Sequence, residues 1–223
     1  MLASAGVAGG LLIAAPGAAA ETGRVSAQYQ GYSTASGPDP YSSSKDVHVA
    51  GYGGQPVVTG YVRLNFGSLP ANSTIGGLRL TLVPNSSRTD NVNTAAAAFE
   101  GCLLTAPLQS DGYQSAPPAY DCSLHVLAEP QSNGTWTFDL SPMVAKWKAS
   151  NTGLALVAYP PPNGIPIKVT PSAWSLAFAH DQTSATVEYT GAPISAPGSA
   201  TDLAAGQPAF AGSQPLSPSV APP

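Results

Sequence analysis

The chain has 223 residues and a formal net charge of −4, with 43% hydrophobic and only 9% charged residues. This length allows one β-sandwich domain with terminal segments, whereas two independent cores would be a tight fit. The 8 basic and 12 acidic residues form no positively charged cluster, so the composition excludes proteins that bind nucleic acid or anionic lipid electrostatically.

The chain opens on an uncharged apolar run of small residues at positions 2–20, with Ala18 and Ala20 before Glu21. A hydrophobic run that ends in an A-x-A pattern is typical of a secretory signal peptide. No Lys or Arg precedes the run, and a retained membrane anchor is the alternative, although the run is short for a span. We expect residues 1–20 to be a signal peptide and the mature domain not to insert into a membrane.

Alternation of apolar and polar side chains dominates the middle of the chain. From Tyr61 to Phe66, the side chains of Val62, Leu64 and Phe66 are expected on a buried face, and the intervening ones on a solvent face. The same period recurs between clusters of Gly, Pro, Asn and Ser. The predicted strands are Arg24–Gln30, Asp46–Ala50, Tyr61–Phe66, Leu78–Leu82, Ala97–Leu104, Ser123–Ala128, Trp136–Leu140, Gly153–Tyr159, Trp174–Phe178 and Thr186–Thr190. Short strands without long helices predict an all-β antiparallel sandwich or barrel.

The two cysteines, Cys102 and Cys122, lie in one region of the chain. In an exported protein they are expected to form a disulfide, which would stabilise the fold by about 3 kcal/mol. A zinc site is the weaker alternative, because His125 is the only histidine near them in the sequence.

One segment departs from the strand pattern. Ser141 and Pro142 are typical of a helix N-cap and first helical position, and Met143 and Trp147 are four residues apart. We predict a short helix from Ser141 to Lys148 with Val144 and Trp147 pointing inward.

The last segment, residues 191–223, is rich in Pro, Ala, Ser and Gly. It cannot bury enough apolar surface to offset its ordering entropy, so we expect a linker or a disordered tail.

Three segments, 61–82, 135–159 and 174–190, together resemble the DNRLRE domain, a jelly-roll β-sandwich related to carbohydrate-binding module family 96. The resemblance covers roughly residues 24–190. It rests on Arg63–Phe66 followed by Leu69-Pro70 and the strand Gly77–Leu82, and then on Asp139, Trp147 and Gly153–Leu156. The resemblance implies an extracellular accessory domain of surface proteins and carbohydrate-active enzymes, in some cases binding acidic polysaccharides. It supplies no set of binding residues.

The sequence shows no catalytic constellation. His48, His125 and His180 are scattered and form no H-x-H or HExxH pattern. The cluster at residues 87–93 could offer oxygens to calcium, and Asp139 and Asp181 could do so at strand ends, but an Asx-rich turn is the preferred interpretation of the cluster. We therefore predict no enzyme activity, no metal and no cofactor.

Aromatic side chains are the strongest hint of a ligand, because sugar rings pack on exposed aromatic planes. Trp136, Trp147 and Trp174 fall at core positions. Tyr113 and Tyr120, both within the expected disulfide loop, are the candidate ligand-stacking residues, although ordinary packing over the sheet is the alternative. Tyr41 and Tyr52 flank another predicted strand.

These observations predict a jelly-roll-like antiparallel β-sandwich at residues 21–190 with one short helix, a signal peptide at 1–20 and a tail at 191–223. We expect an extracellular or cell-surface location and a non-catalytic function. Binding of a polysaccharide or cell-wall glycan is the first hypothesis. A passive spacer or adhesin module is the alternative.

Overall fold

The computed structural model describes residues 19–37, 44–159 and 173–191. Most of the expected signal peptide, the expected C-terminal tail from residue 192 onward and Tyr41 lie outside the described residues. The chain divides into two compact units, Met1–Ala192 and Pro193–Pro223. The second unit lies wholly outside the described residues, so the description below concerns the first.

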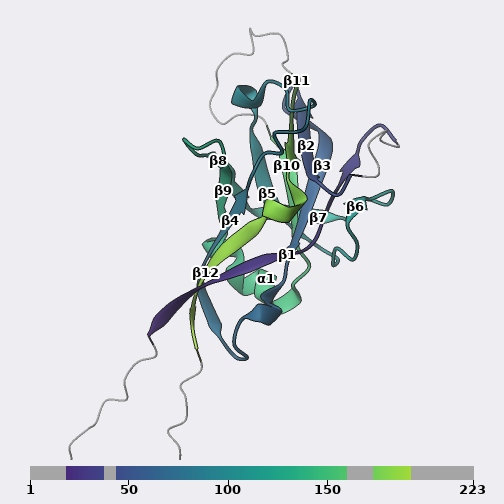
Figure 1. Ribbon diagram of the computed structural model, residues 1–223. Coiled ribbons are helices and arrows are strands. Elements are labelled where there is room, and N and C mark those ends of the chain that lie inside the picture. The colour runs from purple at the N-terminus through teal and green to yellow at the C-terminus, as the bar shows by residue number, and fades with distance from the viewer. Residues whose placement is uncertain (1–18, 38–43, 160–172, 192–223) are drawn as a thin grey trace, which may run out of the picture. The chain divides into compact units, whose positions relative to one another are not determined.

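The described residues form a 12-stranded sheet and one short α-helix (Figure 1). The strands are β1 (Ala20–Thr34), β2 (Val47–Tyr52), β3 (Gln55–Leu64), β4 (Thr74–Leu82), β5 (Phe99–Leu104), β6 (Gly112–Tyr113), β7 (Tyr120–Leu127), β8 (Glu129–Pro130), β9 (Trp136–Asp139), β10 (Leu154–Ala158), β11 (Ala173–Phe178) and β12 (Ser184–Thr190). The helix α1 spans Val144–Ser150 and directly follows a 3-10 turn at Ser141–Met143.

The sheet bends into a nearly closed, barrel-like arrangement with the strand order β7-β5-β10-β3-β1-β12-β4-β9-β8. The first half of β1 pairs with β12 and its second half pairs with β3, so β1 belongs to two regions of the sheet. Region A contains the first half of β1 with β12, β4, β9 and β8. Region B contains the second half of β1 with β3, β10, β5 and β7, while β2 and β11 extend it from β3.

A second connection joins the regions on the other side. β7 pairs in region B, β8 pairs in region A, and only Ala128 separates them in the chain. All strand pairs are antiparallel except the short parallel pair of β1 with β6. The predicted all-β antiparallel architecture with one short helix is therefore confirmed, and each of the ten predicted strands has a counterpart.

The differences concern turns and very short strands. The structure adds β6 and β8, and it extends the strand predicted from Tyr61 backwards to Gln55. β2 and β3 form a hairpin through Gly53 and Gly54, whose φ angles of 57° and 78° suit a tight two-residue turn. This hairpin brings the end of β2 to one end of the described unit.

One main core lies between the two regions. Phe99 of β5 is at its centre, with ring centroids 4.8 Å from Trp136, 5.7 Å from Phe138 and 6.0 Å from Trp174. Because Trp136 and Phe138 belong to region A and Phe99 to region B, these ring contacts hold the two regions together.

A second, smaller core lies on the other face of region B. It contains Tyr61, Cys102, Leu104, Leu108, Ala155 and Val157. The sequence predicted that Tyr61 faces solvent, and this prediction is wrong, because Tyr61 is fully buried. Residues 105–119, which we call the cover segment, pass over this face: Leu108 N–H donates to Thr152 O, and Gln114 N–H donates to Tyr32 O.

The Cys102–Cys122 disulfide is confirmed and joins β5 to β7 at the two ends of the cover segment. The pairing of these strands shifts there, with Cys102 opposite His125 and Leu103 opposite Asp121. Three residues of β7, Cys122 to Leu124, therefore bulge out of the ladder.

The predicted helix is present, but its start differs from the prediction. Ser141 is not the N-cap; it begins the 3-10 turn, and its N–H and hydroxyl both donate to Asp139 Oδ1, at 3.1 and 2.6 Å. Met143, Val144 and Trp147 are buried in the main core. The helical segments among the described residues all fall short of what a membrane-spanning helix requires.

Candidate ligand-binding groove

A groove opens where β2 ends and β11 begins. The two strands pair with Tyr52 opposite Ala173 and Gly51 opposite Trp174. A Cβ atom at Gly51 would lie 2.8 Å from Nε1 of Trp174 and 2.9 Å from Cβ of Ala158. The missing side chain therefore lets the indole lie close against the β2 backbone, where Trp174 forms part of the groove wall.

The groove has a volume of about 490 Å³. Its lining among the described residues is Ala50, Gly51, Tyr52, Val57, Val92, Ala173, Trp174 and Ser175, and none of these residues is charged. The side chain of Tyr52 is 53% exposed, and Val57 and Val92 are also exposed. The described part of the groove thus presents an uncharged, mainly apolar surface with one accessible aromatic ring. The strands β2 and β11 that contribute to it lie in the upper part of Figure 1.

The wall opposite Tyr52 is held by backbone pairing. Val92 and Ser175 exchange two N–H···O hydrogen bonds of 3.0 Å each. Next to them, Asn93 adopts a left-handed conformation with φ 48°, and its Nδ2 donates to Ala173 O at 3.3 Å. These bonds fix the loop before β5 on the outer edge of β11 and thereby position Val92 in the groove wall.

Two other hollows differ in chemistry. One, of about 320 Å³, lies on the outer face of region A beside Arg79, Asp139 and Glu188, and no aromatic residue lines it. The other, of about 290 Å³, has Trp136 and Leu176 in its wall, but both side chains are buried. Of the hollows described, the groove at Tyr52 offers the most accessible aromatic surface.

Tyr113 and Tyr120 are not brought together. The half-buried Tyr113 is in β6, its ring centroid lies 5.7 Å from that of Tyr32, and its hydroxyl donates to Gly37 O at 3.1 Å. Tyr120 is 38% exposed and begins β7, at the opposite side of region B from β6. The two tyrosines thus lie on different strands, and neither is among the described residues that line the groove at Tyr52.

The three tryptophans lie in the main core. Trp147 is fully buried, and Trp136 and Trp174 are nearly so. Only Trp174 also lines the groove.

A Ser-His-Asp arrangement joins Ser44 in the loop before β2, His48 in β2 and Asp90 in the segment between β4 and β5. Nε2 of His48 lies 3.4 Å from Ser44 Oγ, and its Nδ1 lies 3.6 Å from Asp90 Oδ2. Both separations exceed the range of about 2.6–3.2 Å expected for an activated nucleophile. Arg88 donates to both oxygens of Asp90, and Ser44 Oγ accepts the N–H of Asp46. The arrangement fits a set of contacts that hold loops together.

The segment at residues 87–93 likewise uses its oxygens within the protein. Asn85 Oδ1 accepts the N–H of Ser87 at 3.0 Å, as in an Asx turn, and Asn91 Oδ1 accepts the N–H of Ala177 at 2.6 Å. The preferred interpretation of this segment as an Asx-rich turn agrees with these bonds.

Sequence reasoning noted Tyr52 but not the groove. The Gly53-Gly54 pair beside it is a hairpin signal that could have placed Tyr52 at an exposed strand end. No local signal connects it with Val92 or Trp174, because they come from distant parts of the chain.

Comparison with known proteins adds no family: no family model matches the sequence, and no curated protein matches it significantly.

Proposed function

We propose that this chain is an exported, non-catalytic β-sandwich domain of jelly-roll type that binds a polysaccharide or cell-wall glycan in the groove at Tyr52. The observation that carries the proposal is the 53% exposed Tyr52 side chain, which lines a groove whose described residues carry no charge. A sugar ring can pack its C–H face on such a plane, while hydroxyl and backbone groups at the rim accept and donate hydrogen bonds.

The position of the groove suits a surface-displayed domain. Ala20 of β1 pairs with Thr190 of β12, so both ends of the described unit leave from one place, at the lower left of Figure 1. β2 and β11, which contribute lining residues to the groove, lie in the upper part of the same view. A ligand could therefore reach it while the flanking segments hold the domain to other parts of the protein or to a surface.

One further observation supports export, because a disulfide is typical of an oxidising compartment. The segments that resemble the DNRLRE domain contribute to β3, β4, β9, α1 and β10–β12.

The second candidate function is that of a passive spacer or adhesin unit. The contiguous polar face of region A favours it, with Arg24, Thr186, Arg79 and Asp139 in one cross-strand row and no aromatic ring among them. A spacer needs only such a solvated surface and no specific pocket.

The experiment is a glycan array followed by affinity measurements with the full chain. Tyr52→Ala should weaken retention at least about tenfold, since loss of one aromatic stacking contact removes on the order of 1.5 kcal/mol. Tyr120→Ala is the matched control, because it removes an exposed strand tyrosine that lines none of the hollows described above.

High salt should leave retention unchanged, because no charged residue among the described ones lines the groove. Retention that disappears with salt, or that responds to Tyr120 and not to Tyr52, would place the ligand elsewhere. No retention on any of a chemically diverse set of glycans would favour the spacer.

A further inference from the structure

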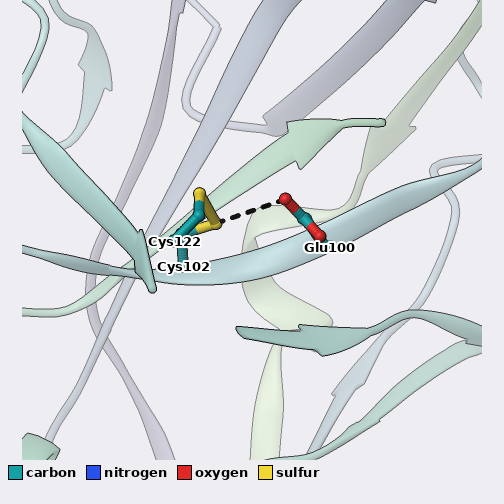
Figure 2. Close-up of side chains that lie close together, drawn as sticks. All are labelled: Glu100, Cys102 and Cys122. Carbon is teal, nitrogen blue, oxygen red and sulfur yellow. Dashed lines mark hydrogen bonds between the residues drawn. A yellow bond between two sulfur atoms is a disulfide. The ribbon is translucent and has the colours of Figure 1, made fainter. Parts of the chain in front are cut away.

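Two further groups with metal-ligating atoms, Glu100 and His125, lie beside the Cys102–Cys122 disulfide. Glu100 and Cys102 are on β5, and Cys122 and His125 are on the facing part of β7. Figure 2 shows the Glu100 carboxylate directed toward the two sulfurs, with its Oε1 3.7 Å from Sγ of Cys102. Ligand atoms of Glu100, Cys102 and Cys122 all lie within 4.8 Å of one another, and Nε2 of His125 lies 3.8 Å from Glu100 Oε2.

The bulge in β7 creates this cluster. Cys102 and Glu100 are two residues apart on one strand and therefore share a face. The three extra residues from Cys122 to Leu124 let both Cys122 and His125 face the same short stretch of β5. Glu100 and Cys122 face each other only because the strands pair. The sequence alone showed only His125 near the two cysteines, so a zinc site was the weaker alternative there.

The hydrogen bond at Nδ1 of His125 fixes the orientation of the other ring nitrogen, Nε2. Nδ1 of the ring lies 2.9 Å from the carbonyl oxygen of Cys122, which can only accept, so Nδ1 carries a proton. In the neutral ring, Nε2 then bears the lone pair, and it is the atom that faces Glu100. A backbone carbonyl on one nitrogen and a free lone pair on the other is the arrangement usual for metal-bound histidine.

The 3.7 Å contact of Glu100 with Cys102, dashed in Figure 2, is not a hydrogen bond in the oxidised protein, because a disulfide sulfur has no proton to donate. The carboxylate and the two sulfurs are therefore acceptors within 4.8 Å of one another, and the Nε2 lone pair of a neutral His125 is a fourth acceptor beside the carboxylate. A cation would be attracted by all of them. The cluster is open to solvent, since the side chains of His125 and Glu100 are 49% and 17% exposed.

We propose that reduction of the disulfide converts this cluster into a zinc site with Cys102 Sγ, Cys122 Sγ, a Glu100 oxygen and His125 Nε2 as ligands. A small dithiol supplies two electrons and two protons, breaks the S–S bond and leaves as its own cyclic disulfide, while the protein gains two thiols. Zinc then displaces the two thiol protons. Two thiolates, one imidazole and one carboxylate are ligands that zinc accepts in tetrahedral sites.

In this form the metal replaces the disulfide as the link between β5 and β7. The bound zinc thus keeps the two ends of the cover segment connected in the reduced protein. It also protects the thiols from reoxidation. The proposal concerns a site separate from the groove at Tyr52 and does not depend on glycan binding.

The test uses the full chain, reduced with a dithiol, freed from it by anaerobic desalting and titrated with Co²⁺ as a spectroscopic probe. We expect one Co²⁺ per chain, a thiolate-to-cobalt charge-transfer band, visible bands of tetrahedral cobalt, and displacement of both by zinc. The oxidised protein should show none of these bands. Zinc should also slow the return of the disulfide on exposure to oxygen.

Two variants separate the proposed site from simple binding by two thiols. Glu100→Gln and His125→Ala should each weaken zinc binding to the reduced protein by at least tenfold, and Glu129→Gln and His180→Ala, which remove the same groups elsewhere, should not. Far-UV and near-UV circular dichroism follow the fold of each reduced protein. The proposal is overturned if neither the Glu100 nor the His125 substitution weakens zinc binding, whether the reduced chain is folded or unfolded. It is also overturned if a folded reduced chain binds no metal.

Discussion

Asp90 holds the segment between β4 and β5 against β2. Its carboxylate accepts hydrogen bonds from Arg88 Nε at 2.9 Å and Nη2 at 2.6 Å, and it lies 3.6 Å from Nδ1 of His48. The hydrogen bonds from Arg88 are the main reason why the pKa of Asp90 lies below its ordinary value, against the opposing effect of partial burial. The charge of His48 lowers that pKa further.

We expect Asp90→Asn to lower the free energy of unfolding by about 1 kcal/mol at neutral pH, a value reduced for partial exposure. Because the pKa is lower in the folded state, the unfolded chain takes up the proton first. The stabilisation is complete above the unfolded-state pKa and is lost as the pH falls through the folded-state pKa. Urea denaturation from neutral to acid pH should give curves for the two proteins that converge on acidification; a constant difference would contradict this account.

Tyr61 makes a buried polar contact under the cover segment. Its hydroxyl lies 2.7 Å from Ser33 Oγ, and burial raises the pKa of Tyr61, so the phenol stays protonated at neutral pH. Tyr61→Phe should cost about 1 kcal/mol of unfolding free energy, because the buried Ser33 hydroxyl loses its partner. In a double-mutant cycle, adding Ser33→Ala should cost less than it does alone, whereas strict additivity would show that the contact contributes nothing.

At the scale of elements, the cover segment changes which strand faces are buried. β10 is buried at every position because its inner residues pack in the main core and Ala155 and Val157 pack under the cover segment. The parallel pair of β6 with β1 and the disulfide anchor the segment at separate points. Region B therefore has a core on both faces, whereas the outer face of region A is polar.

Gly31 is the point where the cover segment approaches β1 most closely. A Cβ atom there would lie 2.0 Å from Gly112 O, a distance that the backbone must relieve by moving. Gly31→Ala should displace β6, cost about 1–3 kcal/mol, and increase amide hydrogen exchange in residues 105–119. Gly76→Ala is the control, since the nearest atom is an ordinary 3.9 Å away. Unchanged exchange in the Gly31 variant would mean that the β1–β6 pair does not hold the segment.

At the scale of the whole described unit, closure of the sheet leaves few free strand edges. β1 passes between the regions on one side and β7 with β8 on the other. The outer edge of β11 is covered by bridges from Val92 to Ser175 and from Pro84 to Phe178. Covered edges resist pairing with strands of other molecules, which is compatible with the proposed extracellular location.

The pairing of Ala20 with Thr190 leads to a prediction about connectivity. A circular permutant that joins residues 190 and 20 by a short Gly-Ser linker, with new ends in the exposed turn at Asn133 and Gly134, should fold with the same disulfide. Because no core strand is cut, its melting temperature should fall by only a few degrees, roughly the shift produced by 1 kcal/mol in a domain of this size. A permutant without a cooperative thermal transition would show that the ends are not paired.

The sequence determined more about the secondary-structure elements than about the candidate site. The alternation in residues such as Leu78, Leu80 and Leu82 sets the strands, because a period of two reports burial within each strand itself. The expected export and the count of two cysteines were likewise enough to predict the disulfide. Of the site, the sequence indicated only that tyrosines outside the core deserved testing.

Only the tertiary structure decided which strands are neighbours and which faces are covered. Tyr61 alternates with buried residues and should have faced water, yet a segment more than forty positions away in the chain covers it. The groove joins Tyr52, Val92 and Trp174, and the disulfide cluster joins Glu100 to His125, across strand pairs of large sequence separation. Such contacts depend on how the closed sheet folds back on itself, and the local pattern of residues along a strand does not specify its partner.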